Sequence, residues 1–103
     1  MAEKTIAGKV VRVNGEGYLE DPGQWSKEVA EAIASELNIK LSDKHYQVIE
    51  FLRAQHLAGI PLTIRKVGNS GITDIKQFYQ LFPGGPLKFS SKIAGIPKPV
   101  SCV

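Results

Sequence analysis

Hydrophobic residues recur along this chain with two different periods, which divide it into a short strand region and a longer helical region. Near the N-terminus, residues 9–13 are rich in β-branched side chains, and Asn14-Gly15 follows as a strong hairpin-turn signal. Residues 16–20 would form the returning strand. Because two strands alone are only marginally stable, we expect this hairpin to pack against helices.

Two longer segments show helical spacing. The first helix would start at Asp21-Pro22, end at Asn38 and present four apolar residues at four-residue spacing: Trp25, Val29, Ile33 and Leu37. The second would begin after its N-cap, Ser42, and stop near residues 59–61. Its apolar face would consist of His45, Val48, Ile49 and Leu52.

Three shorter helices complete the pattern. Residues 62–67 would form one, followed by a glycine-containing turn. Thr73 would cap the next, whose core positions are Ile75, Phe78, Tyr79 and Phe82. Residues 83–86 combine two prolines and two glycines and would end it sharply. A last helix would cover residues 87–94 and be capped by Gly95.

These elements predict a mainly α (α+β) fold: a small orthogonal helical bundle with an N-terminal β-hairpin, a helix-turn-helix-like element and a flexible C-terminal arm. We assign residues 1–95 to the helical domain and residues 96–103 to a mobile arm. Pro97 and Pro99 disfavour helix and favour polyproline II in this arm. At ~3.1 Å per residue it would reach about 20 Å. The length of 103 residues fits one domain.

Charge is divided unevenly between the two halves. Residues 1–51 hold six Lys/Arg and nine Asp/Glu, or −3, whereas residues 52–103 hold seven Lys/Arg against Asp74 alone, or +6. A basic half favours an anionic partner, although solvated lysines scattered over a surface would give the same count. The candidate partner-binding residues are Arg53, Arg65, Lys66, Lys88, Lys92 and Lys98.

The chain has a single cysteine, Cys102, at the penultimate position. A residue so close to the terminus and after Pro-Lys-Pro is not expected in a core, and an exposed thiol is normally avoided unless it is used. Cys102 is therefore the candidate reactive residue. One cysteine cannot form an internal disulfide, and the sequence shows neither a secretory signal nor a membrane-spanning run, so we expect a cytoplasmic protein.

No other group of residues predicts a metal or cofactor site. His45 and His56 lie eleven residues apart without nearby cysteine or carboxylate partners, so both are expected at the surface or its boundary. DNA binding is an alternative, because residues 62–67 and 73–82 could form a helix-turn-helix in the basic half. Its base readers would be few: Lys76, Gln77 and Gln80.

Two blocks of sequence, YQLFPGGP at 79–86 and KIAGIPKPVSCV at 92–103, closely resemble the DsrC/TusE family, and the resemblance extends over almost the whole chain. It implies a helical bundle with a hairpin and a mobile arm, and a penultimate sulfur-carrying cysteine that matches Cys102. Two-cysteine members carry a second cysteine eleven residues earlier, where this chain has Ser91. An internal disulfide or trisulfide is therefore excluded.

The single-cysteine pattern is similar to TusE. That resemblance implies a sulfurtransferase-type carrier that accepts a persulfide and passes it on, without a cofactor, during tRNA 2-thiouridine formation or related sulfur trafficking. Its partners would be sulfur-donor and sulfur-acceptor proteins, such as a tRNA thiouridylase. Whether such a covalent intermediate counts as an enzyme is a matter of definition. The alternatives are a DsrC-like accessory (gamma subunit) of dissimilatory sulfite reductase and a helix-turn-helix regulator.

Overall fold

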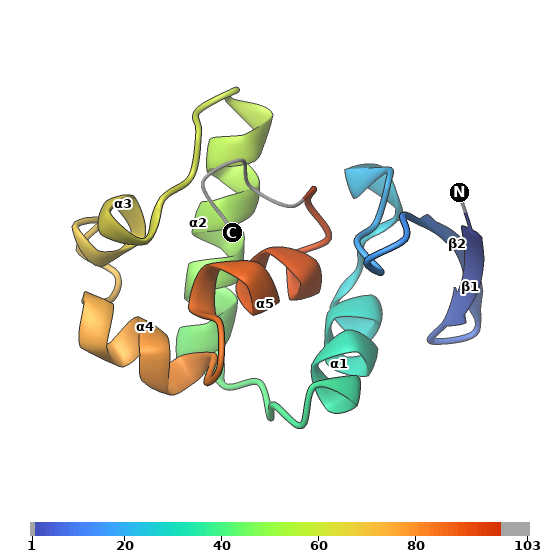
Figure 1. Cartoon of the computed structure of the whole chain (residues 1–103), viewed down its shortest axis with the longest axis horizontal. Coiled ribbons are helices and arrows are strands. Elements are labelled where there is room, and N and C mark those ends of the chain that lie inside the picture. The colour runs from blue at the N-terminus through green and yellow to red at the C-terminus, as the bar shows by residue number, and fades with distance from the viewer. Residues whose placement is uncertain (1, 98–103) are drawn as a thin grey trace.

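A computed structural model describes residues 2–97 and confirms the mainly helical fold (Figure 1). A two-stranded antiparallel hairpin of β1 (Ala2–Ile6) and β2 (Lys9–Val13) comes first, and a 3-10 helix, η1 (Pro22–Gln24), follows. The described residues then form five α-helices: α1 (Lys27–Glu36), α2 (Asp43–Leu57), α3 (Ile64–Gly68), α4 (Ile75–Leu81) and α5 (Pro86–Ile93).

A hairpin that contains residues 9–13 is present, but the prediction that these residues pair with residues 16–20 is wrong. β2 pairs with β1, which precedes it, through a tight turn in which Ala7 and Gly8 have φ of 53° and 78°. Two successive positive φ values are what a two-residue hairpin loop requires. The predicted two-residue turn at Asn14-Gly15 is instead a wider loop. Asn14 Oδ1 holds this loop together by accepting hydrogen bonds from the N–H groups of Glu16 and Tyr18. The expected returning strand contributes only an isolated bridge at Leu19.

The ends of α1 and α2 follow from local capping. The Ser26 hydroxyl accepts a hydrogen bond from the Val29 N–H (3.3 Å), so α1 starts after the predicted position and leaves Trp25 outside it. Asn38 ends this helix as predicted, with a φ of 59°. Ser42 caps α2 as predicted.

His45 lies on the apolar face of α2 as predicted, and it is buried in the first turn of that helix, more deeply than the surface or boundary position expected for it. The Ser42 N–H donates to its Nδ1 (3.0 Å), which places the ring proton on Nε2, and Nε2 donates to the Leu81 carbonyl (2.7 Å). The imidazole therefore closes a capping box and ties α2 to the end of α4.

The short helix α4 corrects two further expectations. Its N-cap is Asp74, whose Oδ1 accepts from the Gln77 N–H (2.7 Å), and not Thr73. Phe78 is buried as predicted, but Ile75 and Tyr79 are 44% and 49% exposed. A seven-residue helix has room for only one buried stripe, and here that stripe continues from Phe78 to Phe82 rather than through Tyr79.

Helix α5 is the centre of the fold. It packs against α1, α2 and α4, and Figure 1 shows it between α1 and α2. Its apolar side joins a core to which the hairpin and all five helices contribute. Burial on several sides fixes the position of α5, which is the last helix of the described chain. Within the described residues no helix has the length and apolarity needed to cross a membrane.

Candidate functional site

The predicted reactive residue, Cys102, lies outside the described residues, as does Lys98. The structure describes the residues that come just before them, 93–97 at the end of α5. We call these residues the arm base. Pro97 is exposed, but Ile96 has only 1% of its surface accessible. Ile96, which the sequence assigns to the arm, is therefore packed into the core.

The backbone of the arm base is fixed by a helix-ending motif. Gly95 adopts a φ of +70°, a left-handed conformation that glycine reaches without a steric penalty. The Ile96 N–H then donates to the Ser91 carbonyl (3.2 Å), and the Gly95 N–H donates to the Lys92 carbonyl (3.2 Å). Such bonds satisfy carbonyls that a helix end otherwise leaves free, and they turn the chain away from the helix axis.

Two side chains from distant elements reach the last carbonyls of this helix. Trp25 Nε1 donates to the Ile93 carbonyl (2.8 Å), and Arg53 Nη1 donates to the Ala94 carbonyl (2.8 Å). The Arg53 guanidinium carbon also lies 4.4 Å from the centre of the Trp25 ring, a distance typical of a cation–π pair. Partial burial lowers the pKa of Arg53, but an arginine remains charged because its ordinary pKa is far above neutrality.

Ser91 has an unusual environment. Its side chain is completely buried, and its Oγ has no hydrogen-bond partner among the residues that the structure describes. The neighbouring Ser90 is equally buried, but its hydroxyl donates to the Leu87 carbonyl (3.2 Å). A buried hydroxyl without a partner is destabilising, so this position is not optimised for serine.

The other candidate cations are distributed over two helices. Lys88 and Lys92 lie on α5, where Lys92 Nζ stands 5.4 Å from the centre of the Tyr18 ring. Arg65 and Lys66 are exposed on α3, at the opposite edge of the described molecule from the hairpin (Figure 1). Lys66 Nζ donates to the Pro61 carbonyl (3.0 Å). The structure thus brings Arg53 to the arm base and leaves the α3 pair apart from it.

The possible DNA readers on α4 form a small set. Gln77 is only partly exposed, because its Oε1 accepts a hydrogen bond from the Thr73 hydroxyl (2.7 Å). Lys76 and Gln80 are exposed. Helix α4 has about two turns, so it offers few side chains to a groove.

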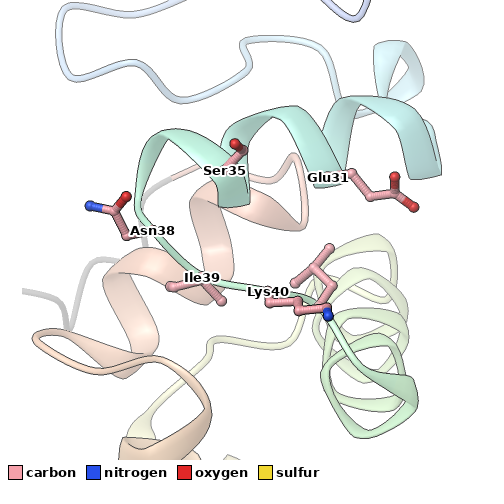
Figure 2. A pocket seen from close by; sticks show the side chains of 6 residues that line it. Glu31, Ser35, Asn38, Ile39 and Lys40 are labelled. Carbon is pink, nitrogen blue, oxygen red and sulfur yellow. The ribbon is translucent and has the colours of Figure 1, made fainter.

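A shallow groove of about 600 Å³ opens at the end of α1 (Figure 2), and none of the predicted site residues is among those that line it. It is lined by Glu31, Ser35, Asn38, Ile39, Lys40 and Leu41. Beside it, the Tyr46 hydroxyl donates to Glu31 Oε1 (3.0 Å), and partial burial together with this carboxylate raises the pKa of Tyr46. Within residues 2–97 no three His, Cys, Asp or Glu side chains gather to hold a metal ion.

Trp25 is the site residue that the sequence pattern concealed. Its spacing matched the apolar stripe of α1, so it was assigned to that helix, whereas the structure places it before the N-cap and against the arm base. The chain has only one tryptophan, but nothing local signals that its indole N–H serves a carbonyl 68 residues away.

Comparison with known proteins gives consistent results. Residues 5–103 match the family described as DsrC like protein. The sulfurtransferase TusE of Salmonella typhimurium is 38% identical over 104 residues, which cover 93% of this chain and 95% of that protein.

Two solved structures are similar over their full lengths. The oxidized gamma-subunit of the dissimilatory sulfite reductase (DsrC) from Archaeoglobus fulgidus superposes with a TM-score of 0.83 at 32% identity and covers 99% of this chain. The DsrC of Allochromatium vinosum gives a TM-score of 0.82 at 34% identity, again covering 99% of this chain. Each match covers 100% of the other protein.

Proposed function

The chain belongs to the DsrC-like protein family, and from this membership we propose that it is a sulfur-relay carrier of the TusE type that holds a persulfide on Cys102. The observation that carries the proposal is the full-length match to TusE sulfurtransferases in a chain with a single, penultimate cysteine. In this proposal the helical domain supports the C-terminal segment, and that segment carries the sulfur on Cys102.

The proposed chemistry is exchange without net oxidation. The Cys102 thiolate attacks the outer sulfur of a donor persulfide, so that a new S–S bond forms on Cys102 while the donor's S–S bond breaks. The donor leaves as a thiolate, and its outer sulfur, with the proton, becomes the terminal sulfur of the new persulfide. In the second step an acceptor thiolate attacks that same outer sulfur, and Cys102 leaves as the thiolate.

Ser91 supports a carrier that exchanges sulfur between proteins. A serine hydroxyl cannot form a disulfide, so the persulfide on Cys102 cannot be resolved by a second thiol within this chain, which has no other cysteine. The sulfur must therefore leave to an external acceptor. We propose a cytoplasmic relay, in which a reducing environment keeps the single thiol available, and tRNA 2-thiouridine formation as its destination.

The basic half supports docking of acidic partner proteins. Arg65 and Lys66 are exposed on α3, and Lys88 is exposed on α5. Exposed charges act mainly on the rate of association and its salt dependence. We propose these residues, with Lys92 and Lys98, as the surface that holds a donor or acceptor near Cys102.

A second candidate is a DsrC-like accessory of dissimilatory sulfite reductase. The structural match to the gamma-subunit from Archaeoglobus fulgidus favours it. In this role the chain would present Cys102 to that enzyme without closing an internal ring. Capture of sulfite reductase subunits by the immobilised chain, in place of a tRNA thiouridylase, would select this candidate.

Sulfur loading tests the proposal directly. Incubation with a low-molecular-weight persulfide should add about 32 Da per sulfur atom, located on Cys102 by peptide mass spectrometry. Cys102→Ser should abolish the added mass and leave the circular dichroism spectrum unchanged. Ser101→Ala, which changes the neighbouring residue and keeps the thiol, should load like the parent. An adduct that persists in Cys102→Ser would refute the proposal.

A further inference from the structure

We propose that Arg53 and Trp25 are positioning residues for the terminal segment: together they hold the end of α5 so that the chain leaves the body in a defined direction. The inference rests on the proposed function, because it takes the segment after residue 97 to carry the sulfur. It assigns to the pair a role inside the chain, distinct from docking a partner.

Side chains from two distant parts of the chain meet the end of α5 at the arm base. The last carbonyls of a helix lack partners within the helix and are usually left to water or to a capping motif. Here the Ile93 carbonyl accepts from Trp25, which precedes α1, and the Ala94 carbonyl accepts from Arg53 on α2. The two bonds therefore connect the end of α5 to α2 and to the segment that leads into α1.

The Trp25 and Arg53 side chains also support each other. The Arg53 guanidinium stacks over the Trp25 ring with 4.4 Å between its carbon and the ring centre. A planar guanidinium can stack and donate a hydrogen bond in the same plane, which an ammonium group cannot do. Each side chain thus restrains the rotamer of the other, which keeps both in position to donate to their carbonyls.

The Trp25 ring lies very close to the backbone of Gly95. A Cβ placed on Gly95 would lie 2.5 Å from Trp25 Cδ1, far inside van der Waals contact. The indole therefore rests directly on the residue where the chain turns. The next residue, Ile96, is buried in the core, so the last described turn of the backbone is held by its own packing as well as by Trp25.

Direction at the base matters because of the expected length of the segment. In the polyproline II conformation that Pro97 and Pro99 favour, Cys102 would be about 16 Å from Pro97, and a tilt of about 10° at the base would move it by about 3 Å. Reacting atoms must come within roughly 3–3.5 Å of each other. A change of direction at the base would therefore shift the region in which the segment presents the sulfur.

The chain offers a direct test, because its only tryptophan lies at the base and its only cysteine near the terminus. A dansyl-type acceptor attached to Cys102 would report the distribution of distances from Trp25 by time-resolved energy transfer, with each unlabelled variant as its donor reference. We expect Arg53→Met to broaden this distribution relative to the parent. Arg53→Lys, which restores a donor without the stacking plane, should give an intermediate width.

Lys66→Met is the matched control, because Lys66 also donates from a cation to a backbone carbonyl, but on α3 and away from the arm base. It should leave the distribution unchanged. If Arg53→Met does not fold, Arg53→Gln keeps a donor of similar length and provides the same comparison. An unchanged distribution in a folded Arg53 variant would overturn the inference. The measurement needs no sulfur, so it is independent of persulfide loading on Cys102.

Discussion

The same tetrapeptide, Ala-Gly-Ile-Pro, ends two helices of this chain, at residues 58–61 after α2 and at residues 94–97 after α5. The backbone responds alike in both places. Gly59 has a φ of +74° and Gly95 a φ of +70°. In each case the isoleucine N–H donates to the carbonyl five residues earlier. Identical local sequence has produced an identical local motif.

The surroundings of the two motifs are opposite. Ile60 is 37% exposed, whereas Ile96 is 1% exposed. Apart from its chain neighbours, no described residue comes within 4 Å of a Cβ built on Gly59, whereas Gly95 is covered by Trp25. The first motif ends a helix and accepts one hydrogen bond from the nearby Lys66 side chain, at the Pro61 carbonyl. The second is held by side chains from two distant parts of the fold, and it precedes the segment that we propose to carry the sulfur.

The largest effect that would sharpen this comparison is expected from Gly95→Ala. A left-handed alanine costs about 1–2 kcal/mol, and displacement of Trp25 adds an overpacking cost of about 1–3 kcal/mol. We therefore expect the free energy of unfolding to fall by about 4 kcal/mol. Urea denaturation followed by circular dichroism measures it.

Gly59→Ala is the control for the backbone term. It carries the same conformational cost without the clash, so it should lose only about 1–2 kcal/mol. The difference between the two variants isolates the contact with Trp25. Equal losses would show that the two motifs are energetically equivalent, and the comparison would fail.

The next effect concerns the isoleucines. Ile96→Ala removes a buried side chain from the core and should lower the free energy of unfolding by about 3 kcal/mol. Ile60→Ala removes a partly exposed side chain and should change it by about 0.5 kcal/mol. Thermal unfolding of both variants provides the comparison, and a loss for Ile60→Ala as large as that for Ile96→Ala would contradict it.

The smallest difference in stability between the two motifs is expected at the residue whose carbonyl accepts the isoleucine N–H. Gln55 holds this place in the first motif and is partly exposed, whereas Ser91 holds it in the second and is buried without a partner among the described residues. Ser91→Ala should therefore raise the free energy of unfolding by about 1 kcal/mol, because it removes a buried hydroxyl that finds no hydrogen-bond partner within residues 2–97.

Ser90→Ala is the matched control at the neighbouring position. It deletes a hydroxyl that does donate, to the Leu87 carbonyl, and should lower the free energy of unfolding by about 1 kcal/mol. The two substitutions remove the same atoms, so opposite signs in urea denaturation would confirm that hydrogen bonding decides the result. Destabilisation by Ser91→Ala would show that its hydroxyl has a partner.

Several features of the fold could be predicted from the sequence because their causes are local. Ser42 begins α2 and Asn38 ends α1 through hydrogen bonds or backbone conformations of a few neighbouring residues. The hairpin partner could not be predicted in this way. Asn14-Gly15 is a strong hairpin signal, yet the hairpin turns at Ala7 and Gly8, because β2 pairs with the strand that precedes it.

The candidate site shows the same division. Cys102 was selected from its uniqueness and position, both properties of the sequence. Its role in sulfur transfer remains a proposal, since it lies outside the described residues. Arg53 was selected only as one cation among six, and nothing in the sequence distinguished it from Arg65. Its hydrogen bond to the arm base became visible only with α2 and α5 in place.

The sequence by itself determined that the chain turns at both Ala-Gly-Ile-Pro segments, because glycine's freedom and the helix-end hydrogen bonds act within six residues. Only the tertiary structure decided that the second turn is buried and held. Its partners, Trp25 and Arg53, lie 68 and 41 residues before the carbonyls that they reach. Contacts over such separations depend on the packing of whole helices, which no local pattern encodes.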